Sequence, residues 1–368
     1  MTTPALHNNH QQGFTIVELM VALVISLLAS IGIYSVFSQS EAQQRRTAET
    51  QDMWQQARIA MTMIERDVRM AGYGLAGNAN CTVSAYNKPK YYDFNMGPIE
   101  SMAPAPSSPL TSPDNSDSLT VLYSSSSSAG LPPTQLRSDM PNSSAELNVT
   151  RTEGFQENDL VLIDQPSLSP RTCVLVQITA VQDSALKLQH QSGTSNRNPP
   201  GGHNTPPFPE NGYAAAQGVN LYNMGNLVNR RYNISTSSEV SGHTDPAPTL
   251  MVTDVNTNIS TPVARGIVLL LVVYGLDSND DGNVDSYARP NSASWFDSNA
   301  SLIRTARVIL LARSSLPDKG QVSPSSITLI PAASSTGAVT YSVPADERQY
   351  RYQLFSTEIP LRNPILAN

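Results

Sequence analysis

The chain has 368 residues, a net charge of −7 and a charged fraction of only 14%. The acidic balance and the lack of a basic patch with interleaved aromatic residues argue against nucleic acid as a partner. Low charge combined with many Ser, Thr, Asn, Gln and Pro residues is typical of an extracytoplasmic, β-rich protein with long loops, and not of a cytosolic α/β enzyme.

An apolar run extends from Phe14 to Phe37 and contains a single carboxylate, Glu18. Its length of about 24 residues is sufficient for a helix to span a bilayer. A carboxylate at membrane depth costs about 2.5–3.5 kcal/mol on insertion scales, so such a residue normally marks a function. The run therefore predicts a transmembrane helix in which Glu18 has a functional role.

The string GFTIVELMVAL, residues 13–23, resembles the class III signal of type IV pilins and pseudopilins. The resemblance implies that a prepilin peptidase cuts between Gly13 and Phe14, and that Phe14 becomes an N-methylated N-terminus. It also implies that Glu18 pairs with the N-terminal amine of a neighbouring subunit in the fibre. Two buried charges of opposite sign each gain by finding a partner. The alternative is an uncleaved signal anchor with Glu18 near the lipid headgroups.

No proline occurs between Phe14 and Met70, and apolar residues recur at steps of three and four from Met53 to Val68. This spacing is the period of an amphipathic helix. We therefore predict one continuous helix of about 55 residues, which would be roughly 80 Å long at ~1.5 Å per residue. Residues 14–37 would suit a membrane or fibre core, residues 38–72 would present one stripe to a globular head, and Gly72 supplies a stop signal.

From Cys81 onward, short β-branched runs alternate with segments rich in Ser, Pro, Asn and Gly, which predicts a β-rich head with long loops. The candidate strands are Leu119–Tyr123, Leu160–Asp164, Thr172–Gln182, Ala185–Gln189, Leu227–Ile234, Leu250–Thr253, Leu269–Leu276, Ala306–Ala312, Ile327–Ile330, Val339–Val343 and Tyr350–Ile359. Residues 263–269 fit either a strand or a short helix, because periodicity cannot decide so short a run.

The predicted fold class is α+β, with a long N-terminal helix packed on a large β-rich head. The expected parts are a cleaved leader (residues 1–13), a transmembrane or fibre-core helix (14–37), its amphipathic continuation (38–72) and the head (73–368). Whether the head is one domain or two is left open.

The two cysteines, Cys81 and Cys173, are expected outside the cytoplasm, where a disulfide is permitted. An even count without Cys-x-x-Cys spacing favours one structural bridge over metal or redox chemistry. The bridge would close a loop of about 90 residues, for which the chain-entropy model gives roughly 4–5 kcal/mol. Two buried free thiols are the alternative.

Residues 277–285 read Asp-x-Asn-x-Asp-Gly-x-Val-Asp, which matches the first nine positions of an EF-hand-like loop. Oxygen ligands at alternate positions, followed by glycine, allow one tight loop to wrap a hard cation such as Ca²⁺. The predicted ligands are the side chains of Asp277, Asn279, Asp281 and Asp285 and the backbone carbonyl of Asn283. Ala288 stands where an EF-hand has its bidentate Glu. The alternative is an acidic hairpin turn, because the same residues favour turns.

Enzyme signatures are missing from the sequence. It contains no His-x-x-x-His pair, no Gly-x-Ser-x-Gly elbow and no Gly-rich phosphate loop. We therefore expect a protein that is not an enzyme.

Further segments resemble PilW-type minor pilins. They are the run VYGLD (residues 273–277) leading into the acidic loop, the strand Arg307–Arg313, the ending RQYRYQLFSTEIPLRN (348–363) and the helix end DVRMAGYG (67–74). The resemblance implies a minor pilin of a type IV pilus that primes or caps fibre assembly, with roles in twitching motility and adhesion.

The same resemblance implies the partners and the location. The expected partners are other minor pilins, the major pilin, the prepilin peptidase, the inner-membrane assembly platform and a tip adhesin. The chain would cross the bacterial inner membrane once, with its head in the periplasm, before it enters the pilus at the cell surface. Two alternatives are a J-type pseudopilin of a type II secretion system and a calcium-dependent pilus-tip adhesin.

Overall fold

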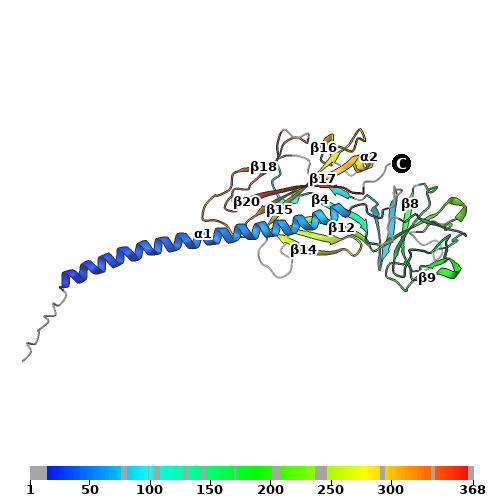
Figure 1. Cartoon of the computed structure of the whole chain (residues 1–368), viewed down its shortest axis with the longest axis horizontal. Helices are drawn as coiled ribbons and strands as arrows, with labels where there is room; N and C mark the ends of the chain where they lie inside the picture. The colour runs from blue at the N-terminus through cyan, green and yellow to red at the C-terminus, as the bar shows by residue number, and fades with distance from the viewer. Residues whose placement is uncertain are drawn as a thin grey trace, which may run out of the picture. The chain divides into compact units, whose positions relative to one another are not determined.

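The computed structural model describes residues 15–75, 81–97, 99–102, 108–126, 131–142, 146–169, 171–200, 208–236, 247–290, 295–332 and 336–363. The chain has the predicted α+β class, with one long N-terminal helix and a large β-rich head (Figure 1). It divides into two compact units, residues 1–52 and 53–368. Helix α1, Ile16–Met70, is continuous over 55 residues. Gly13 and Phe14, the predicted cleavage residues, lie outside the described residues.

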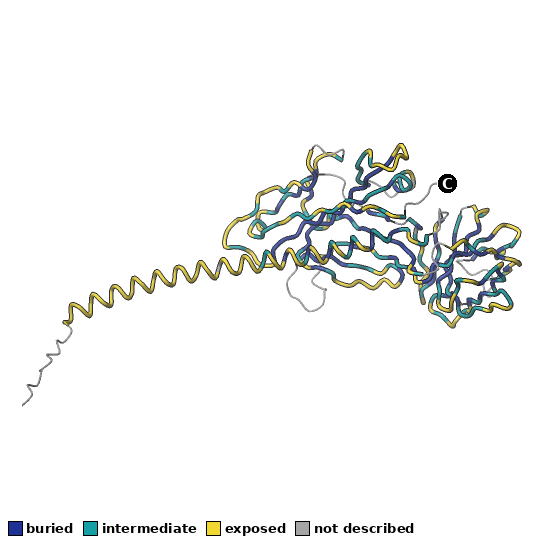
Figure 2. Tube along the Cα trace, in the orientation of Figure 1, coloured by how far each residue is buried: buried dark blue, intermediate teal, exposed yellow. Residues whose placement is uncertain are grey.

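In the first unit, every described residue from 15 to 41 is exposed (Figure 2). This part of α1 contains an 18-residue window with a mean hydropathy of 2.5, which makes it long and apolar enough to cross a membrane. Exposed apolar surface of this extent is unfavourable in water. The segment is therefore expected to be more stable in an apolar environment than in water.

In the second unit, α1 is amphipathic, as predicted. Its buried apolar residues are Met53, Ala57, Ala60, Ile64 and Val68, and the buried Ala71 follows directly after its last residue. They recur at steps of three and four and form one stripe against the sheets of the head. The helix ends where Gly72 adopts a positive φ of 77°, which glycine tolerates at no steric cost.

Two antiparallel sheets pack with this stripe in one apolar cluster. The first has the order β14 (Ile259–Arg265), β13 (Thr249–Asp254), β12 (Leu227–Ser235), β4 (Ser118–Ser124) and β3 (Ile99–Met102). The second has the order β16 (Ser286–Ala288), β15 (Ile267–Leu276), β17 (Ile303–Arg313) and β20 (Tyr352–Pro360).

Strand β15 is buried along its whole length. One of its faces meets the α1 cluster, and the other meets the hairpin of β18 (Ser326–Ile330) and β19 (Val339–Ser342). A strand covered on both faces reads as a continuous apolar run, which is why the sequence there shows no alternation.

The remaining strands form two further sheets. A six-stranded sheet has the order β2 (Lys90–Asn95), β1 (Thr82–Asn87), β8 (Thr172–Gln177), β7 (Leu160–Asp164), β11 (Asn220–Gly225) and β5 (Thr134–Gln135). A three-stranded sheet has the order β6 (Leu147–Asn148), β10 (Lys187–Gln189) and β9 (Ala180–Gln182). The short helical elements are α2 (Trp295–Asn299) and the 3₁₀ turns η1 (Pro113–Asn115), η2 (Asp183–Ala185), η3 (Ala215–Gln217) and η4 (Ala300–Leu302).

Two of the predicted segments are corrected by the structure. The predicted strand Thr172–Gln182 is two strands, because the chain turns after Gln177 and β9 pairs with β10 in another sheet. The short helix considered for residues 263–269 is wrong, since β14 and β15 occupy this segment with a turn at Gly266 between them. β14 pairs with β13 and β15 pairs with β17, and this strand pairing outweighs any local preference of the segment for a helix.

Candidate functional site

The N-terminus of helix α1 is closed by the side chains of Thr15 and Glu18. The backbone N–H and the hydroxyl of Thr15 each donate to Glu18 Oε2 at 3.0 Å, and the Glu18 N–H donates to Thr15 Oγ1 at 3.2 Å. This reciprocal arrangement is a capping box. Our sequence analysis missed it, although Thr-x-x-Glu is its usual signal. Glu18 thus has a partner within its own chain, and its pairing with a neighbouring subunit stays a prediction.

Glu18 is also the one charged side chain among described residues 15–40. Two serines of the apolar segment satisfy their hydroxyls locally: Ser26 donates to the Ala22 carbonyl and Ser30 to the Ser26 carbonyl, both at 2.7 Å. Polar groups that are satisfied in this way are compatible with an apolar environment. Described residues 15–40 therefore carry one charged side chain on a largely apolar helix.

A second carboxylate, Asp67, anchors the other end of the helix to the head. Asp67 is fully buried. It accepts hydrogen bonds from Tyr232 Oη at 2.6 Å and from Tyr123 Oη at 3.1 Å, and Arg230 Nη1 lies 3.0 Å from its Oδ2 and 3.2 Å from its Oδ1. Burial, followed by the charge of Asp67, raises the pKa of Tyr123 to about 12 and also raises the pKa of Tyr232. Both phenols therefore stay protonated and act as donors.

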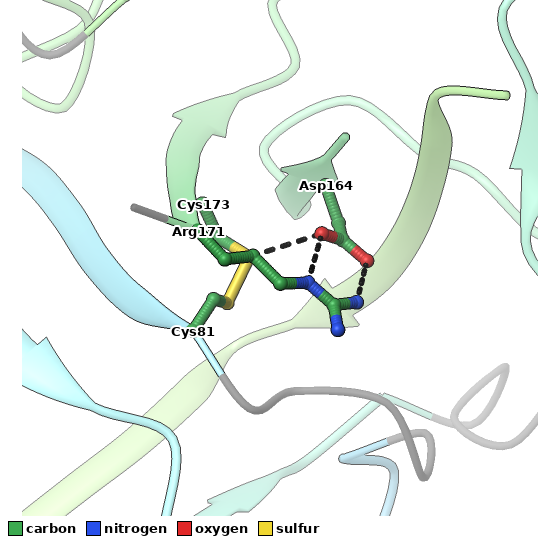
Figure 3. Close-up of a disulfide and its surroundings, with 4 residues drawn as sticks. All are labelled: Cys81, Asp164, Arg171 and Cys173. Carbon is green, nitrogen blue, oxygen red and sulfur yellow. Dashed lines mark hydrogen bonds and ion pairs between the residues drawn. A yellow bond between two sulfur atoms is a disulfide. The ribbon is translucent and has the colours of Figure 1, made fainter. Parts of the chain in front are cut away.

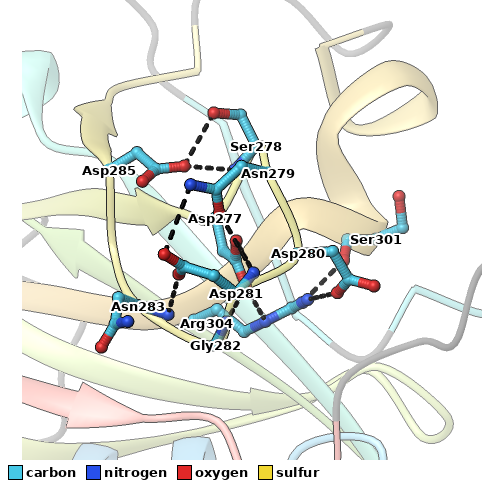
Figure 4. Close-up of polar contacts among 10 residues, drawn as sticks. All are labelled: Asp277, Ser278, Asn279, Asp280, Asp281, Gly282, Asn283, Asp285, Ser301 and Arg304. Atoms are coloured by element: carbon cyan, nitrogen blue, oxygen red, sulfur yellow. Dashed lines mark hydrogen bonds and ion pairs between the residues drawn. The ribbon is translucent and has the colours of Figure 1, made fainter.

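The acidic loop begins at Asp277, whose carboxylate is fully buried. Arg304 Nε lies 3.0 Å from Asp277 Oδ2, and the backbone N–H groups of Asp281 and Gly282 donate to the same carboxylate at 3.2 and 3.0 Å (Figure 4). Arg304 also pairs with Asp280 at 2.8 Å. A guanidinium of this chain therefore neutralises the carboxylate that was predicted to begin the calcium site.

The other predicted ligands act as hydrogen-bond acceptors within the turn. Asn279 Oδ1 accepts from the Asp281 N–H at 3.1 Å, and Asp281 Oδ1 accepts from the Asn283 N–H at 2.8 Å. Asp285 accepts from both the hydroxyl and the N–H of Ser278, which lowers the pKa of its carboxyl. These contacts are those expected of the alternative, an acidic turn.

Within the described part of the chain, no group of three or more His, Cys, Asp or Glu side chains is arranged to hold a metal ion. Gly282 has a φ of 85°, so the sharp turn that the sequence indicates at this position is present. Calcium binding by the loop stays a prediction.

The predicted disulfide between Cys81 and Cys173 is confirmed, and the alternative of two free thiols is wrong. The bridge joins residues 92 apart in sequence, with a Cα–Cα distance of 5.8 Å. It lies where β1 pairs in parallel with β8. Beside it, the buried Asp164 forms a two-point ion pair with Arg171 at 2.7 and 3.1 Å (Figure 3). The bridge therefore links the segment after α1 to the six-stranded sheet.

Comparisons with known proteins match both ends of the chain. Residues 231–363 match the family model described as Type IV Pilus-assembly protein W, a range that includes the acidic loop and strand β20. Residues 8–34 match the prokaryotic N-terminal methylation motif, a range that includes Gly13, Phe14 and Glu18. Searches of curated proteins and of solved structures gave no match.

Proposed function

We propose that this chain, which the two matches identify as a PilW-type protein of the type IV pilin-like superfamily, is a minor pilin that primes or caps the assembly of a type IV pilus. The observation that carries the proposal is the exposed apolar segment of α1 with Glu18 as its one charge among described residues 15–40. Such a helix is suited to move from lipid into a bundle of like helices. The family assignment is that of a structural protein, and we infer that the chain has no catalytic role.

The proposed mechanism begins in the inner membrane. Cleavage of the leader, residues 1–13, would leave an ammonium group on Phe14, four positions before Glu18 in the sequence. An isolated charge in an apolar bundle is costly, and pairing with an opposite charge reduces that cost. An incoming subunit whose ammonium reaches Glu18 of its neighbour would therefore be favoured at one axial register over others. The capping box holds Glu18 by one oxygen, Oε2.

This mechanism suggests a role for each segment of the chain. Residues 14–37 would form the membrane and fibre-core helix, and residues 38–72 would continue it into the head, residues 73–368. A head of this size would obstruct packing in the middle of a helical fibre, which favours a place at the tip. The proposed partners are other minor pilins, the major pilin, the prepilin peptidase, the assembly platform and a tip adhesin. The head would lie first in the periplasm and then at the cell surface.

The test uses a deletion strain and the same strain complemented with the wild-type gene. Surface pili are counted after shearing, and twitching, attachment and type II secretion are measured in the same cells. We expect the deletion to lose pili and twitching while secretion persists, and the wild-type gene to restore them. Loss of secretion with intact pili would contradict the proposal in favour of a J-type pseudopilin. Loss of attachment alone would contradict it in favour of a tip adhesin.

A further inference from the structure

A groove with a volume of about 950 Å³ lies at the head end of helix α1. Its walls come from the last turns of the helix, from the end of β4 and the serines that follow it, from β12 and from the C-terminal segment after β20. Of the two segments that match family models, only residues 231–363 reach the groove, through Arg362 at its rim. Neither the acidic loop nor the disulfide lines it. The function proposed above gives this groove no role.

Four arginines line the groove, and two of them have partners. Arg69 pairs with Glu65 at 2.6 Å, and Arg230 pairs with the buried Asp67 at 3.0 Å. Arg66 and Arg362 are exposed and form no ion pair with any described residue. In a chain whose net charge is −7, these two side chains leave a local excess of positive charge at the rim of the groove.

The rest of the lining is partly apolar. Met70, Tyr73 and Val228 contribute to the walls, and Tyr73 is 37% exposed. The hydroxyls of two lining serines already have acceptors, since Ser124 donates to the Met224 carbonyl at 2.7 Å and Ser125 to the Asn226 carbonyl at 2.8 Å. A surface that combines separated cations with apolar walls fits a peptide with acidic and apolar side chains better than it fits a small anion.

The walls of the groove are held together by hydrogen bonds within the chain. The Gly72 N–H donates to the Leu122 carbonyl at 2.9 Å, and the Ser124 N–H donates to the Tyr73 carbonyl at 2.8 Å, so the segment after α1 is tied to β4. Asn363 Nδ2 donates to the Ala71 carbonyl at 3.3 Å, which holds the residue next to Arg362 against the helix end. A binding surface that is already ordered loses little conformational entropy on association.

We propose that this groove binds an acidic segment of a neighbouring pilin subunit, with Arg66 and Arg362 pairing with two of its carboxylates. The proposal rests on the assembly role above, because it requires an adjacent subunit. Exposed ion pairs add little affinity, but complementary charges select the partner and its register. The groove would therefore determine which subunit stands next to this one, whereas Glu18 would determine the axial position.

The test is crosslinking in cells that make the full-length protein, with a photoreactive amino acid at Thr62, an exposed residue of the groove. We expect a crosslink to another pilin subunit, with at least two Asp or Glu residues in the crosslinked peptide identified by mass spectrometry. The double variant Arg66→Glu/Arg362→Glu should lower the crosslink yield about tenfold, because attraction becomes like-charge repulsion. Replacing the acidic residues of the partner peptide by lysine should restore the yield.

The matched control is Lys90→Glu/Lys319→Glu, which makes the same change in net charge at two exposed lysines outside the groove. It should leave the crosslink unchanged. Steady-state protein level and formation of the Cys81–Cys173 bridge show whether each variant folds. A crosslink that survives the arginine reversal, or that joins Thr62 to residues 364–368 of the same chain or to lipid, would overturn the inference. That result would leave the assembly role intact if the deletion strain still lacks pili.

Discussion

Tyr232 of strand β12 donates its hydroxyl to Asp67 of helix α1 at 2.6 Å, across 165 residues of sequence. The same carboxylate receives Tyr123 and Arg230, so three side chains from β4 and β12 meet one buried acid on the helix. This contact ties the amphipathic part of α1 to the five-stranded sheet.

Replacing Asp67 by alanine is expected to lower the free energy of unfolding by about 3–5 kcal/mol, because Arg230 and the two tyrosines lose a buried partner. Chemical denaturation of the full-length protein in detergent measures this loss. The control is Glu65→Ala, which removes the partly exposed pair with Arg69 and should cost less than about 1 kcal/mol. Equal losses for the two variants would contradict the anchoring role of Asp67.

The bridge between Cys81 and Cys173 is expected to stabilise the head. The double variant Cys81→Ala/Cys173→Ala should lose about 2–4 kcal/mol of unfolding free energy, because the unfolded chain is no longer constrained. The same denaturation experiment with reductant provides the control, since reduction should bring the wild type close to the variant. A wild type that is insensitive to full reduction would show that the bridge contributes nothing.

The acidic loop gives a prediction in which Arg304 and calcium compete. Arg304 neutralises Asp277 and Asp280 in the structure. If the loop binds Ca²⁺, the variant Arg304→Gln should lose thermal stability without calcium and regain more of it than the wild type gains with millimolar Ca²⁺. Melting curves with and without the ion measure both effects, and Mg²⁺ is the control. Curves of both proteins that do not respond to Ca²⁺ would contradict the calcium hypothesis.

Glu358 of strand β20 gives a prediction for pH. Burial raises the pKa of its carboxyl, but hydrogen bonds from Arg307, Tyr287 and Thr305 outweigh burial, so the pKa falls below the ordinary value of 4.5. A lowered pKa in the folded state contributes stability above pH 4.5, and this contribution is lost as the pH falls through the folded-state pKa.

The variant Glu358→Gln should therefore be less stable than the wild type at pH 7 by about 1 kcal/mol. The difference should shrink as the pH falls below 4.5 towards 3. Unfolding free energies of both proteins at several pH values measure this trend. A difference that is constant from pH 7 to pH 3 would show that the carboxylate charge makes no contribution.

The sequence predicted those helices and strands that depend on the spacing of residues close together in the chain. The absence of proline and the spacing from Met53 to Val68 gave helix α1 nearly to its ends, and the strand Leu160–Asp164 was predicted with its observed bounds. The disulfide could be predicted because the sequence contains only two cysteines, which leaves one possible pairing. The strands β1 and β11 were missed because their sequences, TVSAYN and NLYNMG, contain too few β-branched residues for a strand signal.

The anchoring contacts of Asp67 could not be predicted, because its partners Tyr123 and Tyr232 are 56 and 165 residues away. The groove could not be predicted either, because Arg66 and Arg362 line it together only when the C-terminal segment packs at the end of the helix. For the acidic loop, the local sequence pattern was clear but had two interpretations. Its local spacing fits both a cation site and a turn, and only the distant Arg304 distinguishes the two environments.

We propose that Glu18 is the charge through which this subunit enters a pilus, and the number of surface pili is the most direct measurement of that role. The deletion strain is complemented with the wild type, with Glu18→Ala or with Thr15→Ala, which removes the cap hydroxyl but keeps the carboxylate. We predict that Glu18→Ala leaves pili at the level of the deletion, whereas Thr15→Ala restores most of them. Full restoration by Glu18→Ala, at a normal level of processed protein, would contradict the account.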